Sequence, residues 1–322
     1  MPMLLKDLIQ QVPREVESEV RKAKDRFNAR IRHGMRGETR LNLRRRADAA
    51  RGRDETVAVP IVLVSGLPKP LEPQEKQAID NKFGLAVILG RYRRELTALR
   101  DCGEIVSEQL IPQISSESAG RELLDGREES IKKAQDYAAF LLKRLDEFDL
   151  TKFILRVNED VLGRYTYRVR PYSDHPNPTI ELYWGVIGLV AHDLRISVED
   201  LTYVVLAHEL AHAYTHVGFD ANDCYWDSDH FAKTAHELKE GLAQFYTLQI
   251  CKLVAENASD PVGAFSALLS KQPDAYSTHI RWQNASPEDV RLAMLETRSS
   301  GKPGTLAQFE ASLREACSRL RH

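Results

Sequence analysis

The sequence of 322 residues has few cysteines and no long apolar run. No run approaches the ~18 apolar residues that a membrane-spanning helix needs, and the first residues become charged too soon for a secretory signal peptide. The four cysteines lie far apart and form no CxxC pair, which excludes a disulfide-rich scaffold and a cysteine zinc finger. These absences lead us to expect a cytoplasmic protein with no membrane partner. The cysteines are Cys102, Cys224, Cys251 and Cys317.

Neither sign of charge dominates the chain, because 45 basic and 47 acidic residues give a formal net charge of −2. This balance excludes a chain-wide binder of polyanions. Residues 1–56, however, hold 15 Lys and Arg against 9 Asp and Glu. We expect a basic helical arm and linker here, which offers a surface to a nucleic acid or a protein partner. The competing interpretation is a solvated helix and linker, because Glu15, Glu17 and Glu19 interrupt the positive field.

The rest of the chain divides into three regions that differ in their pattern of apolar and polar residues. Residues 57–150 are expected to be an accessory, mainly helical region without a chemical motif, although they open on a short β-branched run. Residues 151–254 contain two expected strands, at 165–169 and 179–184, and then a helix at about 198–217. Residues 255–322 are expected to form a C-terminal helical cover. The expected fold class is therefore α+β and predominantly helical, with a small sheet ahead of the helix.

The helix expected at about 198–217 is apolar on nearly all sides but carries His208, Glu209 and His212. Burial of such groups without partners costs several kcal/mol. His208 and His212 are four residues apart, so they share one face and can both bind a zinc ion. Glu209 lies about 100° around the helix, where it can take a proton from a bound water. The competing interpretation is a hydrogen-bonded histidine pair in the core, which leaves Glu209 unexplained.

A catalytic zinc usually has a third protein ligand. The metzincin pattern fails, because Thr215 stands where its glycine belongs and Gly218 where its third histidine belongs. His216 is excluded as a third ligand, because ligands at three successive turns span about 12 Å of one straight helix; it is expected in the cleft wall or as a helix-end partner. A helix expected at about 229–252 supplies the candidates His230, His236, Glu237 and Glu240.

The segment His208-Glu209-Leu-Ala-His212, followed by Lys239-Glu240-Gly-Leu-Ala243, resembles the gluzincin class of zinc metallopeptidases over about residues 179–250. The resemblance implies a zincin-like catalytic core at 151–254 that binds Zn²⁺ through His208, His212 and Glu240 and hydrolyses a peptide or protein substrate. Glu209 would be the general base. Two residues depart from the class: Lys239 replaces an asparagine, and Gln244 replaces an aspartate that holds a ligand histidine in thermolysin-like enzymes.

Gluzincins also use a downstream tyrosine or histidine to stabilise the oxyanion, which favours Tyr276 or His279 here, with His216 and Tyr225 as nearer alternatives. Zincins commonly hold the substrate along an edge strand, which the resemblance places at residues 179–184. The alternative function is a regulatory or nucleic-acid-binding protein with an autoinhibited or structural zincin site. The intact Glu209 argues against a purely structural site, which needs no general base.

Overall fold

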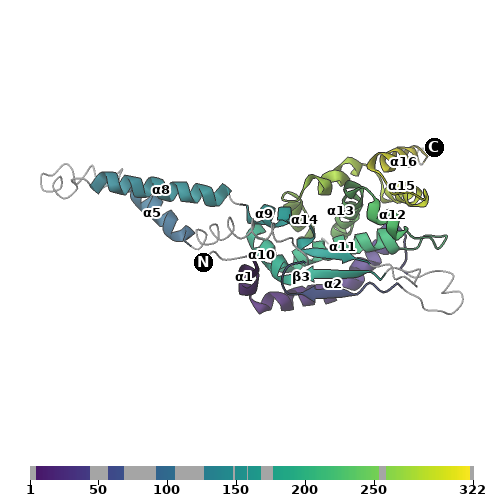
Figure 1. Ribbon diagram of the computed structural model, residues 1–322, viewed down its shortest axis with the longest axis horizontal. Coiled ribbons are helices and arrows are strands. Elements are labelled where there is room, and N and C mark those ends of the chain that lie inside the picture. The colour runs from purple at the N-terminus through teal and green to yellow at the C-terminus, as the bar shows by residue number, and fades with distance from the viewer. Residues whose placement is uncertain are drawn as a thin grey trace. The chain divides into compact units, whose positions relative to one another are not determined.

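The computed structural model describes residues 5–43, 57–68, 92–105, 127–147, 149–157, 159–167, 177–253 and 259–319. The described part is predominantly helical with one three-stranded sheet, which confirms the expected α+β class (Figure 1). None of the helices in these ranges is both long and apolar enough to cross a membrane. The chain forms two compact units, one of residues 1–8 and 71–153 and the other of residues 9–70 and 154–322. The boundaries expected at residues 56 and 254 do not coincide with this division.

The smaller unit contains two described helices that pack against each other, α5 (Arg93–Ile105) and α8 (Arg127–Glu147). On α8, Ala138, Leu142 and Leu145 are buried. Their spacing of three and four residues gives the apolar stripe expected of an amphipathic helix. The helix α9 (Leu150–Val157) spans the division between the two units.

The larger unit is built around α11 (Val198–Val217), which α2 (Arg14–Thr39), α13 (His236–Lys252) and α14 (Pro261–Leu269) all contact. Figure 1 shows α2, α11 and the sheet strand β3 lying together. The helix α10 (Trp184–Leu194) precedes α11 and also packs on α2. The start of α11 agrees with the sequence, because the Ser197 hydroxyl accepts a hydrogen bond of 2.9 Å from the Asp200 N–H.

The helix α2 is part of the core and is not the arm expected from its charge. Its buried positions follow a helical period and face α11, while most of its charged residues are exposed. After α2 the chain stays attached, since Asn42 and Phe219 exchange two backbone hydrogen bonds. The arginines at 44–46 and at 51 and 53 lie outside the described residues. The buried side chains are Val20, Ala23, Phe27, Ile31, Met35 and Thr39.

The sheet has the order β1-β3-β2, with β1 (Ile61–Val64) parallel and β2 (Gly163–Thr166) antiparallel to the central strand β3 (Thr179–Tyr183). The expected edge strand at 179–184 is therefore wrong, because β3 has a hydrogen-bonded neighbour on each side. β2 lies at the side of the sheet that contacts α11. Its register pairs Gly163 with Leu182 and Tyr165 with Ile180.

The C-terminal part is helical, as expected, and packs around α13. The 3₁₀ helix η3 (Asp274–Trp282) contacts α13, and α15 (Pro287–Ser299) packs on α16 (Leu306–Arg319). Gly241 permits the close approach of η3, because a Cβ atom there would lie 2.6 Å from the Trp282 ring. Ser286 and Asp289 form a capping box at the start of α15.

Candidate metal centre

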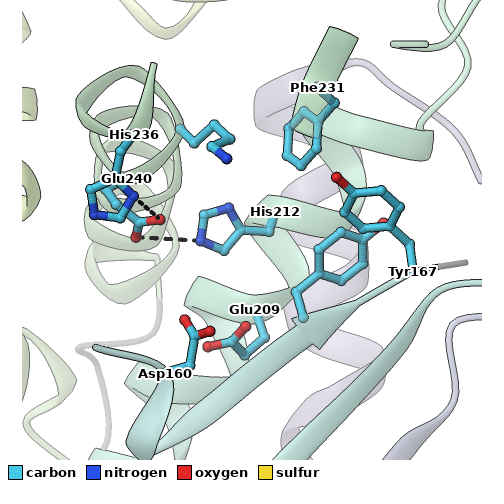
Figure 2. A pocket seen from close by; sticks show the side chains of 9 residues that line it. Asp160, Tyr167, Glu209, His212, Phe231, His236 and Glu240 are labelled. Atoms are coloured by element: carbon cyan, nitrogen blue, oxygen red, sulfur yellow. Dashed lines mark ion pairs between the residues drawn. The ribbon is translucent and has the colours of Figure 1, made fainter. Parts of the chain in front are cut away.

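Two neighbouring helices bring His208, His212 and Glu240 together. The two histidines lie on one face of α11, and Glu240 projects from the first turns of α13. The Nε2 atoms of His208 and His212 are 3.1 Å apart. The Glu240 Oε2 atom lies 3.2 Å from His208 Nε2 and 3.5 Å from His212 Nε2. Figure 2 shows Glu240 directed at the His212 ring, and each of these three side chains is at most 12% exposed.

These distances fit one face of a tetrahedral metal site. Zinc ligands at 2.0–2.1 Å in tetrahedral geometry are about 3.3 Å from one another, and the three observed separations bracket this value. Among the described residues, the Glu240 Oε2 atom is buried and has no partner in hydrogen-bonding geometry. A buried carboxylate oxygen without a partner is costly, and a cation would satisfy it. The group can therefore hold a metal ion.

The ionisation states that this environment favours are those of metal ligands. Burial alone would raise the pKa of Glu240, but its interactions with His212 and His208 outweigh burial and bring the pKa well below the ordinary value. Burial lowers the pKa of His208, against the opposing effect of Glu240. An ionised carboxylate and an imidazole that loses its proton readily are groups that bind divalent transition metals.

Glu209 lies beside the three ligands and is held by the strand β2. Its side chain is buried, and its carboxylate accepts a hydrogen bond from the backbone N–H of Tyr165. A Cβ atom on Gly163 would lie 2.9 Å from Glu209 Oε1 and 2.6 Å from Val205 Cγ1, so glycine is required for this close approach. Burial raises the pKa of Glu209 well above its ordinary value, and Asp160 and Glu240 add to this effect.

An open pocket of about 390 Å³ lies against this group. Figure 2 shows the carboxylates of Asp160 and Glu209 on one side of His212 and the Phe231 ring on the other. Two of the ligands, together with Glu209, are therefore accessible from the pocket. The lining residues are Asp160, Tyr165, Tyr167, Glu209, His212, Phe231, His236, Lys239 and Glu240.

Comparison with known proteins gives no match: no family model, no curated protein and no solved structure corresponds significantly to this chain. The chemical assignment of the site therefore rests on the geometry of its own side chains.

Asp160 is a site residue that sequence reasoning missed. It comes from the short 3₁₀ helix η2 (Glu159–Val161), just before β2. Partial burial and the charge of Glu240 raise the pKa of Asp160, although the Asp160 side chain is still 55% exposed. Nothing in the surrounding sequence resembles a motif. Only the pairing of β2 with β3 brings Asp160 to α11, so local sequence held no signal for it.

His216 lies behind the pocket and is not a ligand. Its Nδ1 atom is 2.8 Å from the Tyr165 hydroxyl, and its Nε2 atom is 3.0 Å from the Ser228 hydroxyl. Its ring stacks on Phe231 with the centroids 4.3 Å apart. Burial lowers the pKa of His216 to about 3, so the ring is neutral. Both nitrogens are used within the protein.

The structure brings Tyr276 to the centre but not His279. The Tyr276 ring stacks on the His208 ring with the centroids 5.6 Å apart, but Tyr276 does not line the main pocket. The His279 Nδ1 atom lies 2.8 Å from the Tyr276 carbonyl oxygen, and its ring packs on Phe265. His279 does not line the pocket and is not one of the three candidate ligands, so the structure does not bring it to the centre. Tyr225 packs on Phe219 and does not line the pocket either.

The other candidates for a third ligand lie outside the group. The His236 Nδ1 atom is 3.8 Å from the second oxygen of Glu240, and its side chain is exposed. His230 pairs with Asp227 at 3.6 Å, near the start of α12 (Ser228–Lys233). Glu237 is exposed on α13. Among the described residues, only Glu240 completes a three-ligand group with the two histidines.

Gln244 occupies the place behind His208 where the resemblance leads one to expect an aspartate. Its amide nitrogen donates a hydrogen bond of 3.0 Å to Gln272. The Gln244 Oε1 atom and the His208 Nδ1 atom are both buried without a hydrogen-bond partner in the described part of the chain. Both residues line a second cavity of about 20 Å³, together with Gln272 and Tyr276. This volume suits one bridging water molecule.

Proposed function

We propose that the protein is a zinc-dependent metallopeptidase with a gluzincin-type, zincin-like core. The observation that carries this proposal is the convergence of His208, His212 and Glu240 beside Glu209, at the wall of an open pocket. Catalytic zinc sites use three protein ligands and keep one position open, whereas structural sites are closed by four. The three ligands found among the described residues correspond to the catalytic arrangement.

Each side chain has a distinct part in the proposed hydrolysis. His208, His212 and Glu240 would hold Zn²⁺, which, when bound, lowers the pKa of water toward ~7 and polarises a carbonyl group. Glu209 accepts the proton of the attacking water and returns it to the leaving amine. The backbone N–H of Tyr165 and the absence of a side chain at Gly163 fix the carboxylate of Glu209 in place.

The same geometry weighs against the alternatives. A hydrogen-bonded histidine pair in the core would not account for the Glu240 carboxylate at 3.2 and 3.5 Å from the two Nε2 atoms. No observation in the described residues favours a structural site in a partner-binding protein, because the pocket opens directly on Glu209 and His212.

The test is the Glu209→Gln variant, which keeps the shape of the side chain and removes the base. We expect metal content and thermal unfolding to match the wild type, while hydrolysis of a mixed peptide library falls by about 10³-fold. Glu237→Gln, on the exposed face of α13, is the matched control and should hydrolyse as the wild type does. Undiminished hydrolysis by a clean Glu209→Gln preparation would refute the assigned mechanism.

A further inference from the structure

We infer that Lys239 recognises a carboxylate group of the substrate within the pocket beside the metal ligands. The carboxylate is either the C-terminal group of a peptide or an acidic side chain next to the bond that is cut. This inference rests on the proposed function, because it names the class of peptide that the same pocket takes.

The ammonium group of Lys239 is fixed at one end of the pocket. Lys239 precedes Glu240 on α13, is half-buried and lines the pocket. Its Nζ atom donates a long hydrogen bond of 3.4 Å to the Ala232 carbonyl oxygen. The same atom lies 5.7 Å from the centre of the Phe231 ring, within the range of a cation–π interaction. Both contacts come from α12, so they hold the charge at the end of the pocket that α12 forms.

This positive charge has no counterion among the described residues. An ammonium group has three N–H donors, and the single long bond to Ala232 occupies one of them. Glu240, the next residue, directs its Oε2 atom at His208 and His212 instead. Two donors of Lys239 therefore remain for a group that enters the pocket.

The charges in the pocket are separated, which gives the substrate a direction. Asp160 and Glu209 lie on one side of His212, and Phe231 lies on the other (Figure 2). Because Lys239 Nζ lies over Phe231, the cationic end of the pocket is on the far side of the metal ligand from the two carboxylates. A peptide that crosses the metal ligands would meet carboxylates at one end and an ammonium group at the other. Of the two ends, the Lys239 end is therefore the one that favours an anionic group.

The pocket wall near Lys239 suits a carboxylate that belongs to an apolar or aromatic residue. Tyr167 and Phe231 both line the pocket, with their ring centroids 5.9 Å apart. Charge-assisted hydrogen bonds in such a partly dry site are stronger than neutral ones. The carboxylate thus supplies the polar contact, and the rings cover the neighbouring carbon atoms.

The experiment uses two pairs of peptide-like hydroxamates, since a hydroxamate binds a metal centre directly. In the first pair, a single residue ends in a free carboxylate or in a carboxamide. In the second pair, the C-terminus is amidated and the side chain is that of glutamate or glutamine. Each compound is titrated by calorimetry into the zinc-loaded wild type, Lys239→Met, Lys239→Arg and Lys233→Met. Lys233 is an exposed lysine of α12 that does not line the pocket, so it is the matched control.

We expect the wild type to bind the carboxylate form of one pair roughly tenfold more tightly than its neutral partner. Lys239→Met should lose this preference while it keeps its metal content and its affinity for the neutral compounds. Lys239→Arg and Lys233→Met should retain the preference. The pair that shows the preference identifies the source of the carboxylate.

Equal affinities within both pairs for the wild type, including an absence of binding, overturn the inference, as does a preference that survives in Lys239→Met. The proposed peptidase activity is measured separately with the peptide library. A charge preference without any hydrolysis contradicts the proposed function, whereas hydrolysis without a charge preference contradicts only the inference about Lys239.

Discussion

The larger unit contains two clusters of buried and half-buried polar side chains beside α11, and they differ in how many of their atoms have hydrogen-bond partners. At the C-terminal end of α11, Arg298 donates hydrogen bonds to the Gly218 and Cys224 carbonyl oxygens and to the Asp220 carboxylate. The second carboxylate oxygen of Asp220 accepts the N–H groups of Asn222 and Cys224. In this clamp, formed by Arg298 and Asp220, both groups have protein partners.

The metal ligands show the opposite pattern. Glu240 Oε2 and His208 Nδ1 are buried without hydrogen-bond partners in the described part of the chain, and the imidazole nitrogens that face Glu240 also face each other. Buried polar groups in folded proteins are almost always paired. A fully paired group such as the clamp stabilises a loop, whereas unpaired atoms at ligand spacing can accept a metal ion, which we propose completes this group.

His216 shows that burial or residue type alone does not separate the two cases. It lies one turn after His212 on the same helix and is fully buried. Its two nitrogens, however, are within hydrogen-bond distance of the hydroxyl groups of Tyr165 and Ser228. Its lowered pKa and its stacking on Phe231 are those of a packed core histidine. The decisive difference is therefore the presence or absence of partners for the ring nitrogens.

The contrast between the two clusters would be wrong if His208, His212 and Glu240 bound no metal. Wild type should contain one zinc per chain by elemental analysis, and Glu240→Ala should lose it because two histidines alone bind weakly. When free zinc exceeds its dissociation constant 1,000-fold, the zinc-loaded wild type should exceed the chelated protein by about 4 kcal/mol in unfolding free energy. Glu237→Ala, on the same helix but outside the group, should keep its zinc. Full zinc content in Glu240→Ala, or none in a zinc-treated wild type, would show that the unpaired atoms have another explanation.

Substitutions in the clamp should lower the free energy of unfolding and leave the metal content unchanged. Asp220→Asn leaves the Arg298 guanidinium, which is 2% exposed, without its charged partner. Removal of one member of a buried ion pair costs about 3 kcal/mol at the lower end of the observed range, and we expect this loss in urea unfolding at neutral pH. Glu288→Gln disrupts a more exposed pair on the same helix α15, with Arg291, and should cost at most about 1 kcal/mol. A similar effect of the two substitutions would contradict the structural importance of the clamp.

The metal site was the more predictable of the two groups. The i, i+4 spacing of His208 and His212 inside an apolar helix indicated their common face, and the resemblance to gluzincins indicated Glu240. The two histidines lie about one turn apart on a regular helix, so local geometry alone brings them together. The start of α11 was predictable for the same reason, since the Ser197 cap acts over three residues.

Long-range pairing explains what the sequence did not show. Asp160 and Gly163 reach the centre only through the position of β2 beside β3, and strand order is not encoded in a local pattern. The central position of β3 was missed for that reason. The burial of α2 was missed for another reason, because its net positive charge is typical of a solvated helix. The apolar positions Val20, Phe27 and Ile31 nevertheless form a face that packs on α11, while most of its charged residues are exposed.

The smallest expected effect is the pH dependence of the stability that the clamp provides. It is best measured with wild type and Asp220→Asn both free of metal. Burial alone would raise the pKa of Asp220, but the hydrogen bonds from Arg298, Cys224 and Asn222 outweigh it, so the pKa is lowered in the folded state. A group whose pKa is lower when folded stabilises the protein above its unfolded pKa of about 3.9 and loses this contribution as the pH falls through the folded value.

The difference in unfolding free energy between wild type and Asp220→Asn should therefore be constant from pH 7 to about pH 5 and should shrink below about pH 4. Urea unfolding at a series of pH values measures it. Glu288→Gln provides the comparison, because the pKa of Glu288 is also lowered, chiefly by its hydrogen bond with Arg291, but the pair is more exposed. Its pH-dependent contribution should be smaller than that of Asp220. If the difference between wild type and Asp220→Asn grew on acidification, the charge of Asp220 would be destabilising in the folded protein. The clamp would then not be a buried polar group whose atoms are satisfied by their partners.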